Sequence, residues 1–327
     1  MSDDIIRLRG NREQLLELFV FLNSNAGRRL LRSNQYGAVV QHLEPHHLDS
    51  VPVPILPSSE RELIVGAIRE SVDAQGRGSI SAESAIQELD QYFDNLPRVP
   101  AAAFSSVPRV LLNHRLDGSY HSPRVSEVES VIRRADLKTQ TLGSARWSKA
   151  IKLPGRFRRT FVAESFGRPL IGGKYLTTLD PRNEKHIALD RLPEILRTAL
   201  PLRPGTLLLS RSGTVGKVGY ALDGWAGWVP SDHIIRIEPV DAARGFFLNA
   251  FLRSDFGQVL VTRNVFGSVV DELDPAWLAN VEVPEVPQRV YESVVSKMAS
   301  AVSDWNRAFD KRREAIENMN RFLEALK

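Results

Sequence analysis

Apolar residues near both ends of the chain follow the spacing of amphipathic helices. Leu18, Phe21 and Leu22 stand at positions i, i+3 and i+4, and the same spacing recurs at residues 248–252. Such spacing places the side chains on one face of a helix. Short apolar runs in between, as at 207–210, are bounded by turn residues and are typical of strands. The pattern therefore predicts helical regions near both ends and a central region of mixed helix and strand.

The two helical regions belong to a duplicated unit. Residues 18–57 align with residues 248–287 without a gap, and 17 of the 40 aligned positions are identical. Gly27 and Gly257 predict where the first helix of each copy ends. A shared proline then begins a short helix, and a Val-x-Val-Pro segment predicts a strand that ends at proline. We expect each copy to fold as helix, loop, short helix and strand.

A long helix is predicted after each copy. Apolar or bulky residues from Tyr291 onward alternate at spacings of three and four, the pattern of a coiled-coil seam. The seam comprises Tyr291, Met298, Val302, Trp305, Phe309, Ile316, Met319 and Leu323. The helix after the first copy has a similar stripe, which Ala74-Gln-Gly-Arg-Gly78 is expected to interrupt because glycine is a weak helix former. A long seam requires a partner helix, so we expect the two helices to pack antiparallel, or against a helix of a partner protein.

Composition narrows the class of protein. The 327 residues suffice for about two domains, and 43% hydrophobic with 25% charged residues is typical of a globular protein. No apolar run is long enough for a membrane helix, and the first residues lack the features of a signal peptide. The absence of cysteine excludes disulfides, thiolate nucleophiles and cysteine zinc sites. We expect a cytoplasmic protein without a membrane partner.

Positive charge concentrates in one part of the central region. The net charge of the whole chain is +4, yet residues 146–217 carry 15 Lys or Arg against 5 Asp or Glu. The stretch 146–159 holds six of these cations and no acid, with Trp147 and Phe157 among them. Cations interleaved with aromatic residues are typical of surfaces that meet nucleic-acid phosphates. A solvated loop of a basic protein is the alternative.

Two motifs suggest other chemistry, and both are disfavoured. Gly213-Thr-Val-Gly-Lys217 has two residues between its glycines and no Ser or Thr after the lysine, so we predict a tight hairpin instead of a phosphate loop. His42, His46 and His47 could bind a metal, but the second copy has no histidine at the equivalent positions. No set of carboxylates resembles a two-metal nuclease site. We predict no catalytic residue, metal site or cofactor in this chain.

Several segments, in order, resemble the specificity (S) subunits of type I restriction–modification systems. Residues 204–217 (PGTLLLSRSGTVGK) are similar to a hairpin of their target recognition domains, and residues 229–236 (VPSDHIIR) to the strand after it. Residues 247–284 resemble the end of such a domain, and residues 113–123 (NHRLDGSYHSP) its beginning. The resemblance covers most of the chain and rests on the order, spacing and duplication of these segments.

This resemblance implies an α+β fold, in which a target recognition domain with β-hairpins accompanies long antiparallel coiled-coil helices. We expect the C-terminal part of a first recognition domain at 1–57 and a helical spacer and linker at 58–112. A complete recognition domain is expected at 113–287, followed by a coiled-coil helix at 288–327. The first copy lacks the upstream part that the second copy has. A second specificity chain, a larger reader or a truncated gene would each account for that difference.

The implied function is non-catalytic reading of double-stranded DNA within a restriction–modification or methylation-associated phage-defence complex. The implied partners are DNA methyltransferase (M) subunits, which use S-adenosylmethionine, and a restriction or translocase (R) subunit, which uses ATP. The alternative is a coiled-coil assembly adaptor that does not read DNA. The residues expected to contact DNA are Arg156, Arg158, Arg159, Lys174, Ser210, Arg211, Ser212, Lys217, Arg263 and Asn264. Among them Arg211 is the candidate for bidentate pairing with guanine.

Overall fold

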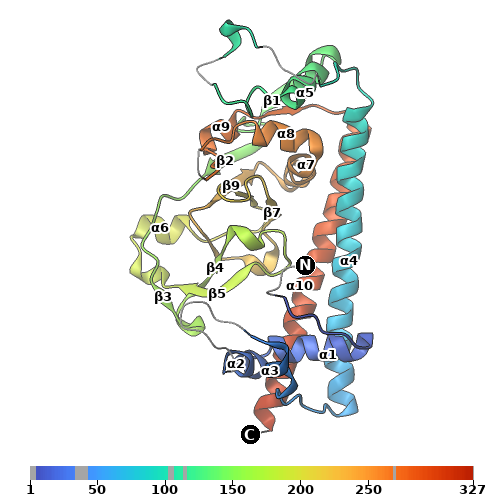
Figure 1. Ribbon diagram of the computed structural model, residues 1–327, viewed down its shortest axis with the longest axis vertical. Helices are drawn as coiled ribbons and strands as arrows, with labels where there is room; N and C mark the ends of the chain where they lie inside the picture. The colour runs from blue at the N-terminus through green and yellow to red at the C-terminus, as the bar shows by residue number, and fades with distance from the viewer. Residues whose placement is uncertain (1–4, 34–42, 102–106, 113–115, 268–269, 327) are drawn as a thin grey trace. The chain divides into compact units, whose positions relative to one another are not determined.

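A computed structural model of the chain describes residues 5–33, 43–101, 107–112, 116–267 and 270–326 (Figure 1). The chain divides into two compact units, one of residues 1–77 and 304–327 and the other of residues 78–303. Two long helices, α4 (Ser58–Asp94) and α10 (Gln288–Ala325), contribute residues to both units. In the part of the chain that is described, no helix is long and apolar enough to cross a membrane.

The first unit consists of helices around one apolar core. Its elements are α1 (Arg12–Asn23), α2 (Asn25–Ser33), α3 (Pro45–Asp49), residues 58–77 of α4 and residues 304–325 of α10. Val20 and Phe21 of α1 are buried together with Ile64 and Ile68 of α4 and Met319 of α10. The apolar face that the spacing of Leu18, Phe21 and Leu22 predicts thus packs against the two long helices.

The second unit combines helices with three β-sheets among the described residues. Its further helices are α5 (Pro123–Arg134), α6 (Glu194–Ala199), α7 (Ala242–Arg253), α8 (Asp255–Thr262) and α9 (Pro275–Ala279), with 3-10 turns η1 (Arg109–Leu111), η2 (Glu164–Phe166), η3 (Gly173–Tyr175), η4 (Leu189–Arg191) and η5 (Asp223–Trp225). Its strands are β1 (Thr139–Thr141), β2 (Ser148–Lys152), β3 (Phe161–Val162), β4 (Arg168–Ile171), β5 (Arg182–Ile187), β6 (Leu207–Ser210), β7 (Val218–Tyr220), β8 (Val229–Pro230), β9 (Ile234–Pro239) and β10 (Glu282–Pro284). The fold class is α+β, as predicted.

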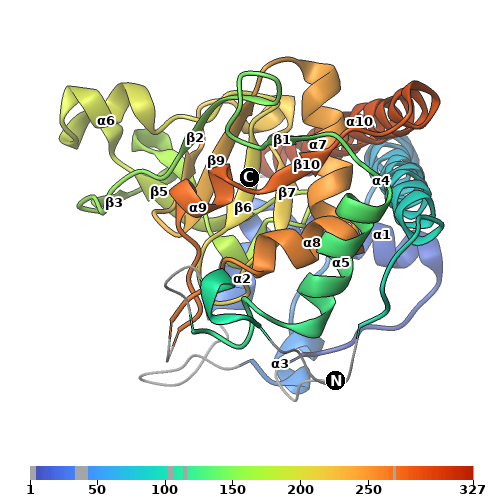
Figure 2. The same cartoon turned by 90° about the horizontal axis from the view of Figure 1, so that it is seen from above.

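Two of these sheets have four strands each, and Figure 2 labels all four strands of the first. One is antiparallel throughout and has the order β2-β9-β6-β7. Its β6 and β7 form the predicted hairpin, in which Leu207 lies opposite Tyr220 and Leu209 opposite Val218. The other sheet has the order β3-β5-β4-β8, with a parallel pairing of β4 and β8. Residues 207–209 are fully buried, which explains why β6 is a continuous apolar run.

Both copies of the repeat break between two helices at a serine. α7 ends at Arg253, and Ser254 has extended backbone and caps α8. Its hydroxyl donates to the Phe251 carbonyl (2.7 Å) and accepts from the Gly257 N–H (3.1 Å). The hydroxyl of Ser24 forms the same two bonds in the first copy, at 2.6 and 3.1 Å. A serine side chain thus satisfies the backbone groups that each break exposes.

Gly27 and Gly257 lie inside α2 and α8, so the prediction that they end a helix is wrong. The break comes three residues earlier, at the serine. A Cβ atom on Gly27 would lie 2.1 Å from the Phe21 carbonyl oxygen, and one on Gly257 would lie 1.8 Å from that of Phe251. Glycine is required here because the second helix turns back against the last turn of the first.

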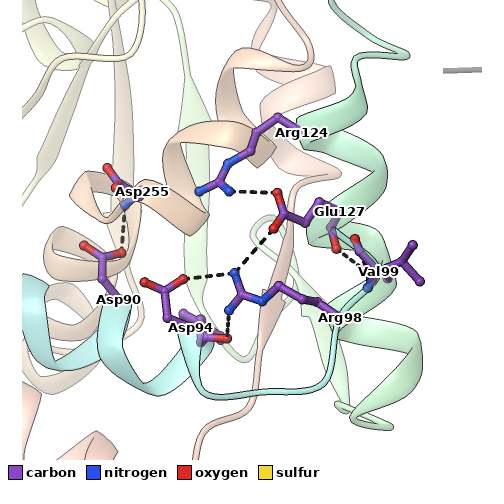
Figure 3. Close-up of polar contacts among 9 residues, drawn as sticks. Asp90, Asp94, Arg98, Val99, Arg124, Glu127 and Asp255 are labelled. Atoms are coloured by element: carbon purple, nitrogen blue, oxygen red, sulfur yellow. Dashed lines mark hydrogen bonds and ion pairs between the residues drawn. The ribbon is translucent and has the colours of Figure 1, made fainter. Parts of the chain in front are cut away.

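Each break is also capped by a long helix. In the second unit, Asp90 of α4 accepts the N–H of Asp255 (2.9 Å; Figure 3). In the first unit, Asn320 of α10 accepts the N–H of Asn25 (2.8 Å). Positions 90 and 320 differ by the same 230 residues as the two copies, and so do the starts of α4 and α10. The duplication therefore extends through the long helices, although the sequence identity ends before them.

Ion pairs anchor the chain where it leaves α4 (Figure 3). Arg98 donates to Asp94 (3.0 Å) and lies 3.6 Å from the Glu127 carboxylate of α5. Arg124, also on α5, donates to the other oxygen of Glu127 (2.8 Å). The start of the linker that follows α4 is therefore attached to α5.

α4 is one continuous helix, so the predicted interruption at residues 74–78 is wrong. Within the first unit, Ser71 donates to the Ala308 carbonyl of α10 (2.7 Å), and Arg77 pairs with Asp304 (3.0 Å). These contacts show that the two helices run antiparallel and approach closely at small residues. Packing of this kind outweighs the weak helix preference of glycine, about 1 kcal/mol per residue.

The predicted seam of α10 packs within the two units, with four of its residues buried and four half-buried. In the second unit, Met298 and Val302 are buried, and the ring of Tyr291 lies 5.1 Å from that of Phe247. The seam residues of the first unit are Trp305, which is half-buried, Phe309 and Met319, which are buried, and Ile316 and Leu323, which pack on the core. The seam thus forms helix packing inside each unit.

The two copies differ at their ends. In the second copy β10 pairs with β1, with Val283 opposite Gln140. Residues 51–57 of the first copy are not a strand, which corrects the prediction, and no described residue of the first unit pairs with them. A strand forms only where a neighbour accepts its backbone hydrogen bonds. Residues 34–42 of the first copy, with Asn34, Gly37 and His42, lie outside the described residues.

Candidate nucleic-acid interface

Two loops lie side by side at one end of the β6–β9 pair. The strand pairing ends with Ser210 opposite Ile234, and the Arg211 N–H donates to the His233 carbonyl (2.9 Å) just beyond it. The turn 211–217 and the loop 231–233 therefore continue the sheet. Gly213 and Gly216 have positive φ angles of 76° and 87°, which explains the glycines of the predicted tight hairpin.

Ser210 belongs to the interior of the turn. It is 2% exposed, and its hydroxyl donates to the Thr214 carbonyl (2.5 Å) and accepts from the Lys217 N–H (2.9 Å). The side chain closes the turn and offers no surface to a partner. We therefore leave Ser210, which the sequence suggested as a DNA contact, out of the proposed DNA surface.

Arg211 is engaged within the protein. Its Nη2 donates to Glu272 (2.9 Å) and its Nε to the Leu273 carbonyl (3.2 Å), while Ser212 forms a β-bridge with Glu272. The guanidinium thus anchors the turn to the segment before α9. The Nε–Nη2 edge of the guanidinium, one of those that bidentate pairing with guanine would use, is therefore already occupied.

The cationic loop between β2 and β3 is fixed by an aromatic residue. Phe157 packs against the core of Leu170, Ile187, Leu192, Leu200 and Val229, and its neighbours Arg156 and Arg158 are exposed. Arg159 forms an ion pair with Asp232, which ties this loop to the loop 231–233. The alternation of side chains turns Phe157 inward and presents the flanking arginines to solvent.

Trp147 is part of the core and is not available to a nucleic acid. It is 2% exposed, and its ring stacks on Phe247 at 5.3 Å. Phe157 is also partly buried. The interpretation of Trp147 as part of a nucleic-acid footprint is therefore wrong, because its burial leaves no ring face for a base.

Lys174 lies beside the same turn. A Cβ built on the preceding Gly173 would lie 3.8 Å from Ser210 Cβ, and the Lys174 side chain is exposed. We call the resulting region the hairpin surface, and it comprises Arg156, Arg158, Lys174, Ser212, Lys217 and His233. Within the described part of the chain, its four cations form no ion pair.

Arg263 and Asn264 serve the end of α8. Arg263 pairs with Glu129 of α5 (2.8 Å), and its guanidinium lies 4.2 Å from the ring centre of Tyr120. The Asn264 amide donates to the Leu260 carbonyl (3.1 Å). Both residues, predicted as DNA contacts, thus hold α8 and its neighbours in place.

His233 was missed by the sequence reasoning. Its Nδ1 lies 2.7 Å from the Ser212 hydroxyl, and its side chain is 50% exposed. The signal was present in the segment Val229-Pro-Ser-Asp-His, where a histidine stands at the start of a strand. Its importance depends on a neighbour 21 residues earlier, which no local pattern shows.

The histidines that the sequence suggested as a metal site lie in the first copy of the repeat. His47 accepts the Glu44 N–H (3.0 Å) at the start of α3. Among the described residues, no group of three or more His, Cys, Asp or Glu side chains is arranged to hold a metal ion.

Three solved structures are similar to this chain. The match with the HsdS subunit from Thermoanaerobacter tengcongensis covers 94% of this chain and 68% of the HsdS chain, at 16% identity and a TM-score of 0.39. The type I restriction–modification S subunit from M. genitalium matches 95% and 71% at 13% identity and a TM-score of 0.36. A structure from work on complex assembly and conformational transition of the type I R-M system matches 98% and 72% at 16% identity and a TM-score of 0.39.

No family model and no curated protein matches the sequence. The first of these structures is described as an HsdS subunit, and the other two belong to type I restriction–modification systems. Similarity at these identities and TM-scores assigns neither a DNA target nor a partner to this chain.

Proposed function

We propose that this chain is a non-catalytic subunit that reads double-stranded DNA within a restriction–modification or methylation-associated defence complex. The hairpin surface carries this proposal, because cations without an ion-pair partner surround a turn that the sheet holds rigidly. Cations hold phosphates without regard to sequence, whereas rigid polar groups can read base edges. The surface offers both kinds of group.

The cations of this region divide into two sets. Arg159 and Arg211 pair with Asp232 and Glu272, so their charge is neutralised and they position the loops. Arg156, Arg158, Lys174 and Lys217 have no such partner among the described residues. This second set supplies the phosphate contacts in our proposal.

The proposal assigns the chemistry to partner subunits. Methyltransferase subunits would use S-adenosylmethionine and a restriction or translocase subunit would use ATP, while this chain supplies the target. The long helices would dock these partners, and Ile80 of α4, which is 72% exposed, is an apolar position suited to that role. Residues 113–287 are the complete recognition domain in this proposal, and residues 1–57 correspond to the C-terminal part of another.

The test uses the full chain, co-purified with a DNA methyltransferase subunit and incubated with a randomised duplex library at two salt concentrations. We expect enrichment of one motif, with binding that weakens as salt rises. One variant carries serine in place of Arg156, Arg158, Lys174 and Lys217. In this variant the negative slope of log K against log salt should become about 3–4 less steep, because each phosphate contact contributes about 0.9 to its magnitude. The matched control replaces four exposed cations of other segments, Arg29, Arg134, Lys138 and Arg289, and should leave most of the slope intact.

Three results would contradict the proposal. A stable complex that enriches no motif would favour the assembly adaptor. Modification or cleavage of DNA by the purified chain alone would show that it is an enzyme. Equal losses of slope in the cationic variant and its control would remove the hairpin surface from the interface.

A further inference from the structure

We infer that Ser212 and His233 act as one hydrogen-bonded pair that reads the acceptor edge of a guanine in the major groove. This inference rests on the proposed DNA-reading function and names residues that determine its specificity. The pair is the only contact of the hairpin surface, among those described, in which two exposed or half-exposed polar side chains bond each other.

The backbone holds the pair rigidly. The Arg211 N–H donates to the His233 carbonyl (2.9 Å), and the His233 N–H donates to the Ser231 hydroxyl (3.3 Å). Ser212 is attached from its other side by the β-bridge with Glu272. Direct readout requires side chains whose positions are set before the DNA arrives, because ordering them on binding would reduce the affinity.

The charges beside the pair are neutralised. Asp232 precedes His233 and pairs with Arg159, and Glu272 faces Ser212 and pairs with Arg211. These ion pairs keep the carboxylates from repelling DNA at this point. They also leave little net charge to attract a phosphate to Ser212 and His233. Lys217, opposite Ser210 in the same hairpin, has no ion-pair partner among the described residues, so it keeps its charge for a phosphate.

The proposed donor is the Nε2–H group of His233. Its Nδ1 lies 2.7 Å from the Ser212 hydroxyl oxygen, and when the hydroxyl donates to Nδ1 the neutral ring carries its proton on Nε2. The side chain is half exposed, so it presents the Nε2–H as a donor to a partner.

Guanine offers the matching edge. In the major groove its N7 and O6 are adjacent acceptors, whereas cytosine presents a donor and adenine pairs an acceptor with a donor. Thymine presents one acceptor, O4, beside its methyl group. An N–H donor placed between N7 and O6 therefore finds two acceptors on guanine, one on adenine or thymine and none on cytosine, which favours guanine. The serine fixes the ring plane and hence the direction of the donor.

The test measures binding of the full chain with its methyltransferase subunit to a randomised duplex library and to duplexes that differ at one base pair. We expect His233→Ala to lower the preference for guanine at one position by about five- to one-hundred-fold, with the salt slope unchanged. Ser212→Ala should lower the preference at the same position by a smaller factor. His233→Gln should shift that position toward adenine, since glutamine pairs with N6 and N7.

The control variant is Lys217→Ser, which should weaken binding to all sequences alike and make the slope of log K against log salt about 1 less steep. The inference is overturned if His233→Ala weakens all sequences alike with the motif retained, because the histidine would then contact the backbone or only shape the loop. A wild-type complex that enriches no motif refutes the proposed function itself. Should His233→Ala fail to fold, the shift toward adenine in His233→Gln and the loss in Ser212→Ala decide the question.

Discussion

Replacing Gly257 with alanine is expected to disrupt the junction between α7 and α8. The new Cβ atom would lie 1.8 Å from the Phe251 carbonyl oxygen and 2.8 Å from its carbon. An ordinary contact between such atoms is about 3.4 Å or more, so α8 or the carbonyl would have to move by about 1.6 Å. That carbonyl is held by the Ser254 N–H and hydroxyl. We expect a loss of about 3 kcal/mol or more in the free energy of unfolding, at the upper end of overpacking effects.

Gly76 supplies the matched control, because it lies in α4 and no atom stands within 4 Å of the position that its Cβ would take. Gly76→Ala should stabilise the protein by about 0.5–1 kcal/mol through helix preference alone. Gly27→Ala should repeat the destabilisation in the first unit, since its Cβ would lie 2.1 Å from the Phe21 carbonyl oxygen.

Urea denaturation followed by circular dichroism gives the change in stability, and hydrogen exchange locates it. Exchange should accelerate in α7–α8 for Gly257→Ala and in α1–α2 for Gly27→Ala. If Gly257→Ala unfolds within about 0.5 kcal/mol of the wild type, the junction is not constrained by the carbonyl contact and the explanation of the repeated glycine fails.

Two further substitutions test the packing. Burial, with the nearby Asp255 carboxylate, raises the pKa of Asp90 above its usual value, so the free energy of unfolding falls as pH rises from the ordinary Asp pKa to the raised one. Asp90→Asn, which copies Asn320, should remove this fall and stabilise the protein at neutral pH. Urea titrations of both proteins at several pH values test this, and equal pH profiles would refute the assignment. Trp147→Ala should cost about 3–5 kcal/mol in the free energy of unfolding, because the ring is 2% exposed and stacks on Phe247; a loss below about 1 kcal/mol would indicate that the ring is a surface residue.

Elements with strong local patterns were predicted correctly from the sequence. The hairpin of β6 and β7 lies where its glycines indicate, and the helices α7 and α10 lie where the apolar spacing indicates. These patterns suffice because a helix or hairpin is determined largely by residues close together in the chain. The continuity of α4 was missed because its weak segment is stabilised by contacts with α10, including the Arg77–Asp304 ion pair.

The candidate site was predicted in part. Sequence reasoning identified the turn around Gly213 and the cationic stretch that contains Arg156 and Arg158. It also included Ser210, whose hydroxyl the structure places inside the turn, and it omitted His233. Residue type and charge show that a group could bind DNA, but they do not show whether the protein already uses that group.

The sequence by itself determined the duplication, the long helices, the tight hairpin and the excess of positive charge. These follow from residue spacing and composition, which act over a few neighbouring residues or over a whole segment. The tertiary structure alone decided which cations remain without an ion-pair partner and which polar side chains meet. Arg211 is paired because Glu272, 61 residues away, folds against it, and Ser212 bonds His233 from 21 residues away. Ion pairs and hydrogen bonds form at distances of about 3 Å, and only the folded chain sets distances on that scale between residues far apart in the sequence.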